Sequence, residues 1–305
     1  MDKIMDKIIK ALLSADIGQV MTNEPMKLHT TWKIGGPADL FILPKTKEDL
    51  QTTLRLLKDH HIPWMILGRG SNLLVRDGGI RGAVIQLGEA FGQLEISGEE
   101  VRVGAAYPMI RLVVQVGRMG LEGLEFAGGI PGSVGGAVYM NAGAHGSDIS
   151  QVLKEATILW ENGSIESVPN EKMRFRYRTS ILQETRGIVL EATFRLRPGE
   201  RAELAKRMAV FKDRRMKTQP LQEPCAGSVF RNPPGDHAAR LIEACGLKGR
   251  QIGDAKISEK HANFIVNKGH ATAKDVLELI QLAQKEVYDR FSISLETEVL
   301  VMGDE

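Results

Sequence analysis

The sequence predicts an α+β protein, and three observations support this fold class. Amphipathic segments of helical period and short segments rich in Val, Ile and Leu both occur among the 305 residues. Several of the short segments follow one another without a helix between them. The glycines from Gly68 resemble the motif of a parallel nucleotide-binding sheet, but they do not match that motif fully. The length allows two or three domains, each with its own core.

The first half of the chain predicts three helices and several short strands. The helices are expected near the N-terminus (Ile4, Ile8 and Leu12 on one side), after the capping-box-like Thr46–Asp49 (Leu50, Leu54 and Leu57) and over 108–120 (Ile110, Val113, Val114 and Gly117). Strands are expected at 39–44, 64–67, 73–75, 83–87, 94–96 and 101–103.

The stretch Phe126–Gly146 contains seven of the 32 glycines of the chain. Glycine reaches positive φ at no steric cost, so backbone N–H groups can converge on one point and hold an anion such as a diphosphate. Pro131 suits the first position of a short helix, whose N-terminus would add a favourable dipole. A plain turn needs only one or two glycines, so we interpret this stretch as a dinucleotide cradle.

The second half predicts a hairpin, a break and a second group of helices. The hairpin strands 155–160 and 164–168 flank Asn162-Gly163, a strong two-residue turn signal. A strand over 188–196 ends at Arg197-Pro198-Gly199, where we expect a domain boundary. After it come helices at 201–217, 238–245 and from the cap at Thr272 (Val276, Ile280, Ala283, Val287 and Phe291 buried), short strands within 251–266 and a last strand over 293–302.

Composition excludes several classes of protein. Hydrophobic residues make up 43% and charged residues 26%, as in soluble globular proteins. The net charge of +2 and the scattered Lys and Arg give no indication of a nucleic acid, but suit a phosphorylated small molecule. No apolar run predicts a membrane span or signal peptide. Two cysteines and seven histidines without ligand spacing predict a reducing cytoplasm and no metal.

The pattern GRGSNL from Gly68 to Leu73 resembles a dinucleotide fingerprint but lacks its third glycine. A Rossmann motif has glycine at the sixth position and opens a helix, whereas here that position is Leu73, inside a predicted strand. Gly68, Gly70 and Ser71 therefore predict a second backbone cradle, with Asn72 adding a side-chain hydrogen bond. Two cradles, well separated along the chain, could hold one diphosphate from two sides.

Six motifs in order resemble one family. They are IGGPAD from Ile34, LGRGSNLLV, AGGIPGSVGGAVYMNAGAHG, YRTS, AGSVFRNP and LETEV. Together they are similar to the UDP-N-acetylenolpyruvoylglucosamine reductases of bacterial cell-wall synthesis, from about Leu28 to Gly303. The resemblance implies non-covalent FAD in a domain of the vanillyl-alcohol-oxidase type (the PCMH fold) with two α+β subdomains, plus a smaller α+β substrate domain. The implied bounds are a helical segment at 1–27, the FAD domain at 28–198 and the substrate domain at 199–305.

The resemblance also implies a reaction and its partners. NADPH reduces FAD, the flavin N5 delivers hydride to carbon 3 of the enolpyruvyl group of UDP-N-acetylenolpyruvoylglucosamine, and carbon 2 takes a proton to give UDP-N-acetylmuramate. Conjugation with the carboxylate leaves negative charge near carbon 2, so the site needs a cation and an acid there. No nucleic acid or membrane partner is implied, and the protein is expected to be monomeric.

Three residues match the family's catalytic positions. Arg178 would bind the substrate carboxylate, although RFRYR could equally be the solvated face of a strand. Ser228 would donate the proton, although a serine after glycine is more often a turn residue. Glu298 would polarise the substrate or tune the donor; Glu296 would share its strand face, so a role for it stays open. Cys225 has no nearby histidine and is not interpreted as a nucleophile.

Binding residues also follow from the resemblance. The implied FAD contacts are Gly68, Arg69, Gly70, Ser71, Asn72, Leu73, Gly128, Gly129, Ile130, Pro131, Gly132, Ser133, Gly136, Ala137, Asn141, Gly143, His145 and Val189. The implied substrate and nucleotide contacts are Tyr177, Lys217 and Asn232. The sequence lacks the tyrosine of the family's long form, because no tyrosine lies between Arg178 and Ser228. Two alternatives remain open: a flavin oxidase of the same fold and a non-catalytic nucleotide-sugar sensor.

Overall fold

The computed structural model describes residues 3–305, which form two compact units, each built from three stretches of chain. The first contains the residues up to Met21, Leu40–Arg69 and Ala83–Asp213; the second contains Thr22–Asp39, Gly70–Gly82 and Arg214–Glu305. The domain bounds implied by the sequence, 1–27, 28–198 and 199–305, follow the chain continuously and stay a prediction. Met1 and Asp2 lie outside the described residues.

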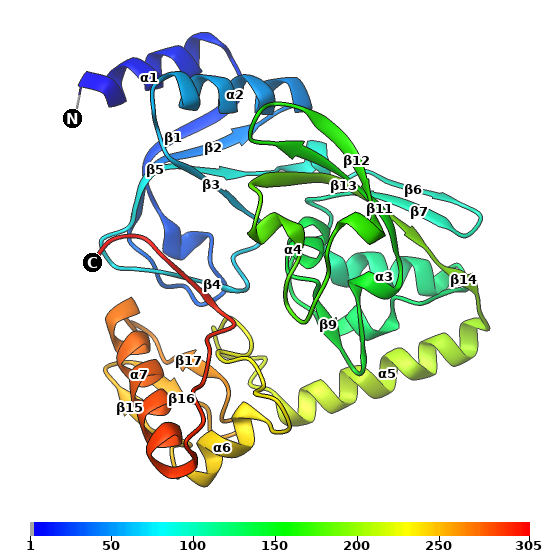
Figure 1. Ribbon diagram of the computed structural model, residues 1–305, viewed down its shortest axis with the longest axis vertical. Helices are drawn as coiled ribbons and strands as arrows, with labels where there is room; N and C mark the ends of the chain where they lie inside the picture. The colour runs from blue at the N-terminus through cyan, green and yellow to red at the C-terminus, as the bar shows by residue number, and fades with distance from the viewer. Residues whose placement is uncertain (1–2) are drawn as a thin grey trace. The chain divides into compact units, whose positions relative to one another are not determined.

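One part of the first unit packs two helices on a mixed sheet. The elements are α1 (Lys3–Ser14), α2 (Lys47–Asp59), β3 (Trp64–Leu67) and parts of three longer strands: β1 (Gly18–Pro25) up to Met21, β2 (Pro37–Pro44) from Leu40 and β5 (Ile80–Gln86) from Ala83. The sheet order is β1-β2-β5-β3. Helices α1 and α2 lie side by side (Figure 1). Ile8 and Leu12 of α1 and Leu50 and Leu57 of α2 are buried in one core, as their spacing predicts.

The other part of the first unit is a five-stranded antiparallel sheet with helices packed against it. Its strands are β6 (Leu94–Ser97), β7 (Glu100–Gly104), β11 (Leu153–Trp160), β12 (Ile165–Pro169) and β13 (Gly187–Arg195), in the order β12-β11-β13-β7-β6. The turn between β11 and β12 uses Gly163 at φ +91°, so the predicted Asn-Gly hairpin is confirmed. Helices α3 (Met109–Arg118) and α4 (Val134–Tyr139) share its core.

Short elements complete the first unit. They are the pairs β8 (Leu121–Glu122) with β14 (Arg197–Pro198) and β9 (Gly143–Ala144) with β10 (Ser147–Asp148), and the 3₁₀ turns η2 (Glu89–Phe91), η3 (Glu125–Gly129), η4 (Ile149–Gln151), η5 (Asn170–Lys172) and η6 (Ile181–Gln183). Helix α5 (Arg201–Thr218) contributes its residues up to Asp213 to this unit and the rest to the other. Leu204 of α5 is buried, and Met208 packs against the core of the five-stranded sheet.

The second unit combines a three-stranded sheet with two helices and a parallel strand pair. Its elements are η1 (Met26–Leu28), β4 (Leu73–Val75), α6 (Ala238–Ala244), β15 (Gln251–Ile252), β16 (Ala255–Ile257), β17 (Ile265–Asn267), α7 (Ala273–Phe291) and β18 (Leu300–Met302). Helix α7 packs beside β15 and β16, and α6 packs against α7 (Figure 1). The last strand, β18, pairs in parallel with β4, which lies in the first third of the sequence. No helix within residues 3–305 is long and apolar enough to cross a membrane.

Three sequence-based expectations are wrong. In α3 the buried face is Met109, Leu112, Val113, Val116 and Gly117, while Ile110 and Val114 are exposed, because the helix packs through a face about one position away from the expected one. The final strand covers only Leu300–Met302, not 293–302. Strand β1 was not expected, because its residues include Gly, Gln, Thr and Asn rather than a continuous apolar run.

Candidate active site

Two glycine-rich segments meet in the first unit. Gly68, directly after β3, lies so close to Ser133 that a Cβ atom added at Gly68 would be 2.8 Å from the Ser133 Oγ. Only glycine can therefore occupy position 68 without moving Ser133. The carbonyl of Gly68 accepts a hydrogen bond of 2.9 Å from the side chain of Gln86 at the end of β5. The chain thus brings residues 68 and 133 together, as the two-cradle hypothesis expects for a shared ligand.

Ser133, and not Pro131, begins the helix after the glycines. Its hydroxyl accepts a hydrogen bond from the Gly136 N–H at the start of α4. The expectation that Pro131 occupies the first helical position is wrong, because α4 starts at Val134. Gly135 allows the close packing of α4: its N–H donates to the Ala105 carbonyl, and an added Cβ would be 2.9 Å from the Ala105 Cβ.

Arg178 is held in a strained loop against the cradle. Its φ is +56°, which is uncommon for a residue with a Cβ atom. The Arg178 Nη2 donates to the Gly143 carbonyl at 2.9 Å, and its guanidinium carbon lies 4.9 Å from the ring centroid of Tyr177. The alternative that RFRYR forms a solvated strand face is wrong, since Arg176 and Thr179 close a tight turn instead.

Two polar side chains fix this loop to the cradle. The Asn141 amide donates to the Arg176 carbonyl at 3.0 Å while its oxygen accepts from the Ser150 N–H at 3.0 Å. The Ser180 hydroxyl donates to the Tyr139 carbonyl at 2.7 Å. Both side chains are buried, so these bonds are shielded from water. The Arg178 loop therefore keeps a fixed register relative to residues 139–143.

His145 stacks on α5. Its ring lies parallel to the ring of Phe211 within 6°, with the centroids 3.9 Å apart. His145 also has a left-handed backbone, with φ +53°. The sequence predicted a polar neighbour of the cofactor at this position. The stacking shows that one ring face is covered by the helix.

In the second unit, Ser228 and Glu298 lie on paired segments. The Glu298 N–H donates to the carbonyl of Val229, the residue after Ser228, at 2.7 Å. Phe230 and Thr297 form an isolated β-bridge in the same register. The predicted strand over 293–302 is therefore confined to Leu300–Met302, while residues 296–298 pair with residues 229–231 through a few main-chain contacts, and a role for Glu296 beside Glu298 stays a prediction. Both Ser228 and Glu298 are half-buried, and Glu296 is exposed.

Asn263 supports the Ser228 segment from the other side. Its side chain makes a reciprocal pair of bonds with Phe230: the Phe230 N–H donates to Oδ1 at 2.9 Å, and Nδ2 donates to the Phe230 carbonyl at 2.8 Å. The Val229 N–H donates to the Asn263 carbonyl. Asn263 is 4% exposed, so the amide acts as a buried substitute for a neighbouring strand.

Thr31 connects the glycine loop that contains Gly70 to the segment that carries Ser228. Its hydroxyl lies 2.7 Å from the Cys225 carbonyl and 3.3 Å from the Gly70 carbonyl, and its N–H donates to the Gly70 carbonyl. Gly70 itself has φ +59°, and an added Cβ would be 2.2 Å from the His29 carbonyl oxygen. The loop before β4 is therefore tied to the loop before Ser228 within one unit.

Two family models match this chain. The model described as FAD binding domain matches residues 38–168, and the model described as UDP-N-acetylenolpyruvoylglucosamine reductase, C-terminal domain, matches residues 219–302. Proteins named UDP-N-acetylenolpyruvoylglucosamine reductase are 55% identical in Bacillus licheniformis over 301 residues and 51% identical in Bacillus subtilis over 300 residues. Each alignment covers 98% of this chain and 99% of the relative. The chain belongs to the UDP-N-acetylenolpyruvoylglucosamine reductase family.

A solved structure supports the same assignment. The crystal structure of the family member from Thermus caldophilus superposes with a TM-score of 0.82 at 38% identity, over 93% of this chain and 98% of the other. The predicted fold class is confirmed: a PCMH-type FAD-binding domain with the family's C-terminal domain, of mixed α and β structure. The resemblance drawn from six sequence motifs is confirmed as well.

The first unit of this reductase-family chain fits a phosphate-bearing cofactor at its glycine-rich segments. The close approach of Gly68 to Ser133 places the main chain of one glycine-rich segment beside the serine hydroxyl of the other, and main-chain N–H and hydroxyl groups are donors that suit phosphate oxygens. This unit contains Gly68, Arg69, Gly128, Gly129, Ile130, Pro131, Gly132, Ser133, Gly136, Ala137, Asn141, Gly143, His145 and Val189. The second unit contains Gly70, Ser71, Asn72 and Leu73, and their contacts to FAD stay a prediction, as do those of the first unit.

The predicted substrate contacts have defined structural partners. The Asn232 Oδ1 accepts a hydrogen bond from the Ala238 N–H at the start of α6, which fixes the orientation of the amide. Lys217 is exposed in the last turn of α5, and Tyr177 is 51% exposed. Their roles stay a prediction. No cluster of His, Cys, Asp and Glu that could hold a metal occurs within residues 3–305.

Sequence reasoning missed Thr31, Ser180, Phe211 and Asn263. Each acts through a partner far along the chain; Thr31, for example, bonds Cys225. Thr31, Phe211 and Asn263 lie in no pattern that indicates chemistry, and Ser180 lies in the YRTS motif without a role of its own being predicted. Only the three-dimensional contacts reveal that they support the predicted site residues.

Proposed function

We propose that this protein reduces UDP-N-acetylenolpyruvoylglucosamine to UDP-N-acetylmuramate with NADPH and one bound FAD, in bacterial peptidoglycan synthesis. The observation that carries the proposal is the hydrogen bond from the Glu298 N–H to the Val229 carbonyl. It joins two segments, distant in sequence, that carry the predicted acid and the predicted glutamate. The family membership and the full-length match to the reductases support the same activity.

The substrate determines what the site must provide. Its double bond is conjugated to a carboxylate, so a hydride added at carbon 3 leaves negative charge at carbon 2 and on the carboxyl oxygens. FAD, when bound, accepts a hydride from NADPH and supplies it to the substrate. The overall reaction consumes one NADPH and one proton, and forms one C–H bond at carbon 3 and one at carbon 2. The protein must therefore bind a carboxylate and deliver a proton.

Arg178 is the residue we assign to the carboxylate. A guanidinium stays charged at every physiological pH and can bind two carboxylate oxygens with a fixed planar geometry. The bond from Nη2 to the Gly143 carbonyl limits the orientations that the Arg178 side chain can adopt. A cation that is already oriented stabilises developing charge without reorganising during the reaction.

Ser228 is the residue we assign to the proton transfer to carbon 2, with Glu298 adjusting it. A serine hydroxyl is a weak acid and acts only next to a strongly basic carbon, which charge at carbon 2 provides. Gly227 at φ +76° makes the turn that precedes Ser228, and Asn263 holds the residues that follow it. The two free cysteines agree with a reducing compartment, so we propose the cytoplasm.

Ser228→Ala tests the proposal. We expect NADPH to bleach the flavin absorbance of the variant at the wild-type rate, because that step needs no proton donor to carbon 2. Return of the absorbance on adding UDP-N-acetylenolpyruvoylglucosamine should slow by about 10²–10⁴-fold, the usual contribution of a general acid. Stopped-flow absorbance measures both steps separately.

Ser167→Ala is the matched control, since the Ser167 hydroxyl only bonds Glu155 on the exposed hairpin of β11 and β12. It should leave both steps unchanged. Unchanged substrate reduction in Ser228→Ala would remove Ser228 as the donor. Rapid oxygen consumption with a simple sugar, and no response of the wild-type protein to the enolpyruvyl nucleotide, would instead indicate a flavin oxidase. Binding of the nucleotide without any turnover would indicate a sensor.

A further inference from the structure

Asn72 makes two contacts to the segment that contains Glu298. Its side-chain Nδ2 donates to the Glu298 carbonyl at 3.1 Å, and its own carbonyl accepts from the Leu300 N–H at 3.0 Å. The parallel pairing of β4 and β18 begins at the next residue, with Leu73 opposite Leu300. Asn72 therefore extends the strand pair toward Glu298 by means of its side chain.

The Glu298 main chain is consequently fixed at both polar groups. Its N–H donates to the Val229 carbonyl at 2.7 Å, and its carbonyl accepts from Asn72. The first of these bonds is main chain to main chain and does not depend on side-chain identity. The second depends entirely on the amide of Asn72. The side chain of Asn72 thus controls the orientation of the Glu298 main chain, from which the Glu298 carboxylate projects.

An amide at position 72 is chemically specific. The acceptor is a carbonyl oxygen, so the side chain must present an N–H or O–H donor. Aspartate has the same shape as asparagine but presents an oxygen, which would leave the Glu298 carbonyl facing a negative charge. Losing a partly buried bond of this kind destabilises the segment, because one partner remains unsatisfied. The change Asn72→Asp therefore removes the contact with little change in volume.

We propose that Asn72 is a positioning residue for Glu298, so that the glycine loop before β4 sets the geometry of the acid–base pair Glu298 and Ser228. The sequence pattern predicts a role for Asn72 toward FAD, whereas its amide is directed to Glu298 in the structure. The inference rests on the proposed function, because Glu298 acts in that reaction. It predicts that Asn72 influences proton delivery and not cofactor affinity.

Asn72→Asp separates these two roles. We expect the variant protein to bind FAD with a dissociation constant within about twofold of wild type, measured by titrating apoprotein and following flavin fluorescence. Bleaching of the flavin by NADPH should keep its wild-type rate. Return of the absorbance with the enolpyruvyl nucleotide should slow by about tenfold to a hundredfold, as expected when a catalytic group is misplaced by a fraction of an ångström or more. Asn72→Ala, which adds no charge, should show the same pattern if Asn72→Asp does not fold.

Asn267→Asp is the matched control in the same unit. The Asn267 Nδ2 also donates to a main-chain carbonyl, that of Trp32, at 3.0 Å, and Asn267 is 5% exposed, so the change disturbs a more buried bond. If lost stability alone slowed the reaction, Asn267→Asp would slow it at least as much as Asn72→Asp. We expect both variants to lose stability in urea unfolding, and only Asn72→Asp to lose the substrate step.

A double mutant tests whether Asn72 acts through Glu298. In a Glu298→Gln background, Asn72→Asp should cause no further slowing of the substrate step. The proposal is overturned if the rate losses of the two single mutants multiply in the double mutant, or if Asn267→Asp slows the substrate step as much as Asn72→Asp. It is also overturned if Asn72→Asp weakens FAD affinity and saturating FAD restores the rate of the substrate step. A wild-type protein that never accepts the enolpyruvyl nucleotide would instead refute the proposed function and is recognised before any variant is made.

Discussion

At the residue scale, three residues of the candidate site combine a Cβ atom with a left-handed backbone. Asn141, His145 and Arg178 have φ of +43°, +53° and +56°. Asparagine tolerates a left-handed backbone, whereas for arginine this conformation costs about 1–3 kcal/mol. The strain persists because the side chains of Asn141 and Ser180 hold the loop on both sides of Arg178. A guanidinium in a fixed position is the result, which is what carboxylate binding needs.

Cys225 gives a prediction at the same scale. Burial raises the pKa of the Cys225 thiol, against the opposing effects of the Gly227 N–H and of Arg215. A raised pKa lowers the thiolate fraction at pH 8, and the thiolate is the reactive form. We expect alkylation of Cys225 by iodoacetamide at pH 8 to be slower than that of free cysteine, and still to accelerate above pH 9. Peptide mass spectrometry over a pH series measures this rate.

Urea-unfolded protein is the control for Cys225, since both cysteines should then react as free thiols. Alkylation of the folded protein near pH 7 as fast as that of free cysteine would contradict the prediction. It would also reopen the interpretation of Cys225 as a nucleophile, which the sequence disfavours because no histidine lies near it.

The sequence alone predicts candidate residues for the chemistry but not how they are held. Ser228 and Glu298 follow from motif positions, whereas the bond through the Val229 carbonyl depends on two segments that are distant in sequence. The supporting residues Thr31 and Asn263 bond main-chain groups of distant loops. Ordinary threonine and asparagine side chains carry no local pattern that distinguishes such roles.

At the scale of elements, the capped helix α7 was predictable because its start is encoded locally. Thr272 and Asp275 make both bonds of a capping box. The last strand is predicted over 293–302, but only Leu300–Met302 form it; the main-chain groups of Glu298 bond the Val229 carbonyl and the Asn72 side chain instead of a continuous neighbouring strand. The residue types before Leu300 favour extended backbone, but the neighbouring segment in the fold decides whether a continuous strand pairing forms.

Two carboxylates and one hydroxyl accept hydrogen bonds from main-chain N–H groups at the N-terminus of α7. Besides the capping box, the Asp77 carboxylate accepts hydrogen bonds from the Ala273 N–H at 2.9 Å and the Lys274 N–H at 3.1 Å. Thr272→Ala should lower the free energy of unfolding by about 1 kcal/mol, the usual value of a cap. Asp77→Ala should cost at least as much, because it removes two charge-assisted bonds and a charge that favours the helix dipole.

Urea unfolding followed by circular dichroism measures both losses. Thr46→Ala at α2 is the comparison, since that hydroxyl also accepts the N–H of the third residue into its helix, but within residues 3–305 no carboxylate assists it as Asp77 assists Thr272. A smaller loss for Asp77→Ala than for Thr272→Ala would contradict the importance of the carboxylate.

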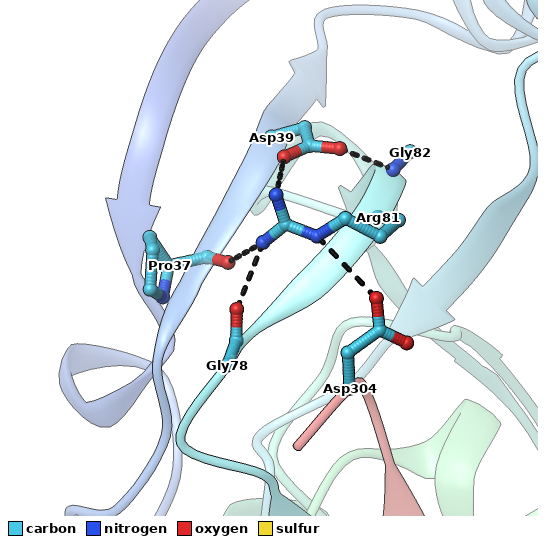
Figure 2. A network of polar contacts seen from close by, with 6 residues as sticks. All are labelled: Pro37, Asp39, Gly78, Arg81, Gly82 and Asp304. Carbon is cyan, nitrogen blue, oxygen red and sulfur yellow. Dashed lines mark hydrogen bonds and ion pairs between the residues drawn. The ribbon is translucent and has the colours of Figure 1, made fainter.

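At the scale of the molecule, each compact unit is assembled from separated stretches of the sequence. The second unit contains residues 22–39, 70–82 and the C-terminal part of the chain. Its first and last stretches meet around Arg81, which bonds the Pro37 and Gly78 carbonyls and the carboxylates of Asp39 and Asp304 (Figure 2). The boundary predicted from Pro and Gly at 197–199 stays a prediction, because the change of unit along the chain falls between Asp213 and Arg214, and composition gives no information on which distant stretches pack together.

The Arg81 network allows a last prediction, on which of its two ion pairs stabilises the fold. Asp39 is 19% exposed, bonds Arg81 directly and also accepts from the Gly82 N–H at 2.9 Å. Asp304 is 65% exposed and lies 3.8 Å from the Arg81 Nε. Water and salt screen the second pair much more than the first.

We therefore expect a double-mutant cycle of Arg81→Ala with Asp39→Asn to give a coupling free energy of about 0.5–1 kcal/mol, and the cycle with Asp304→Asn to give about zero. Urea unfolding at low and high salt measures both cycles, and the coupling to Asp39 should shrink only partly in salt because that carboxylate is mostly covered. Equal couplings for the two aspartates would mean that the charge of Arg81, rather than its fixed geometry over residues 37–39, holds the end of the chain.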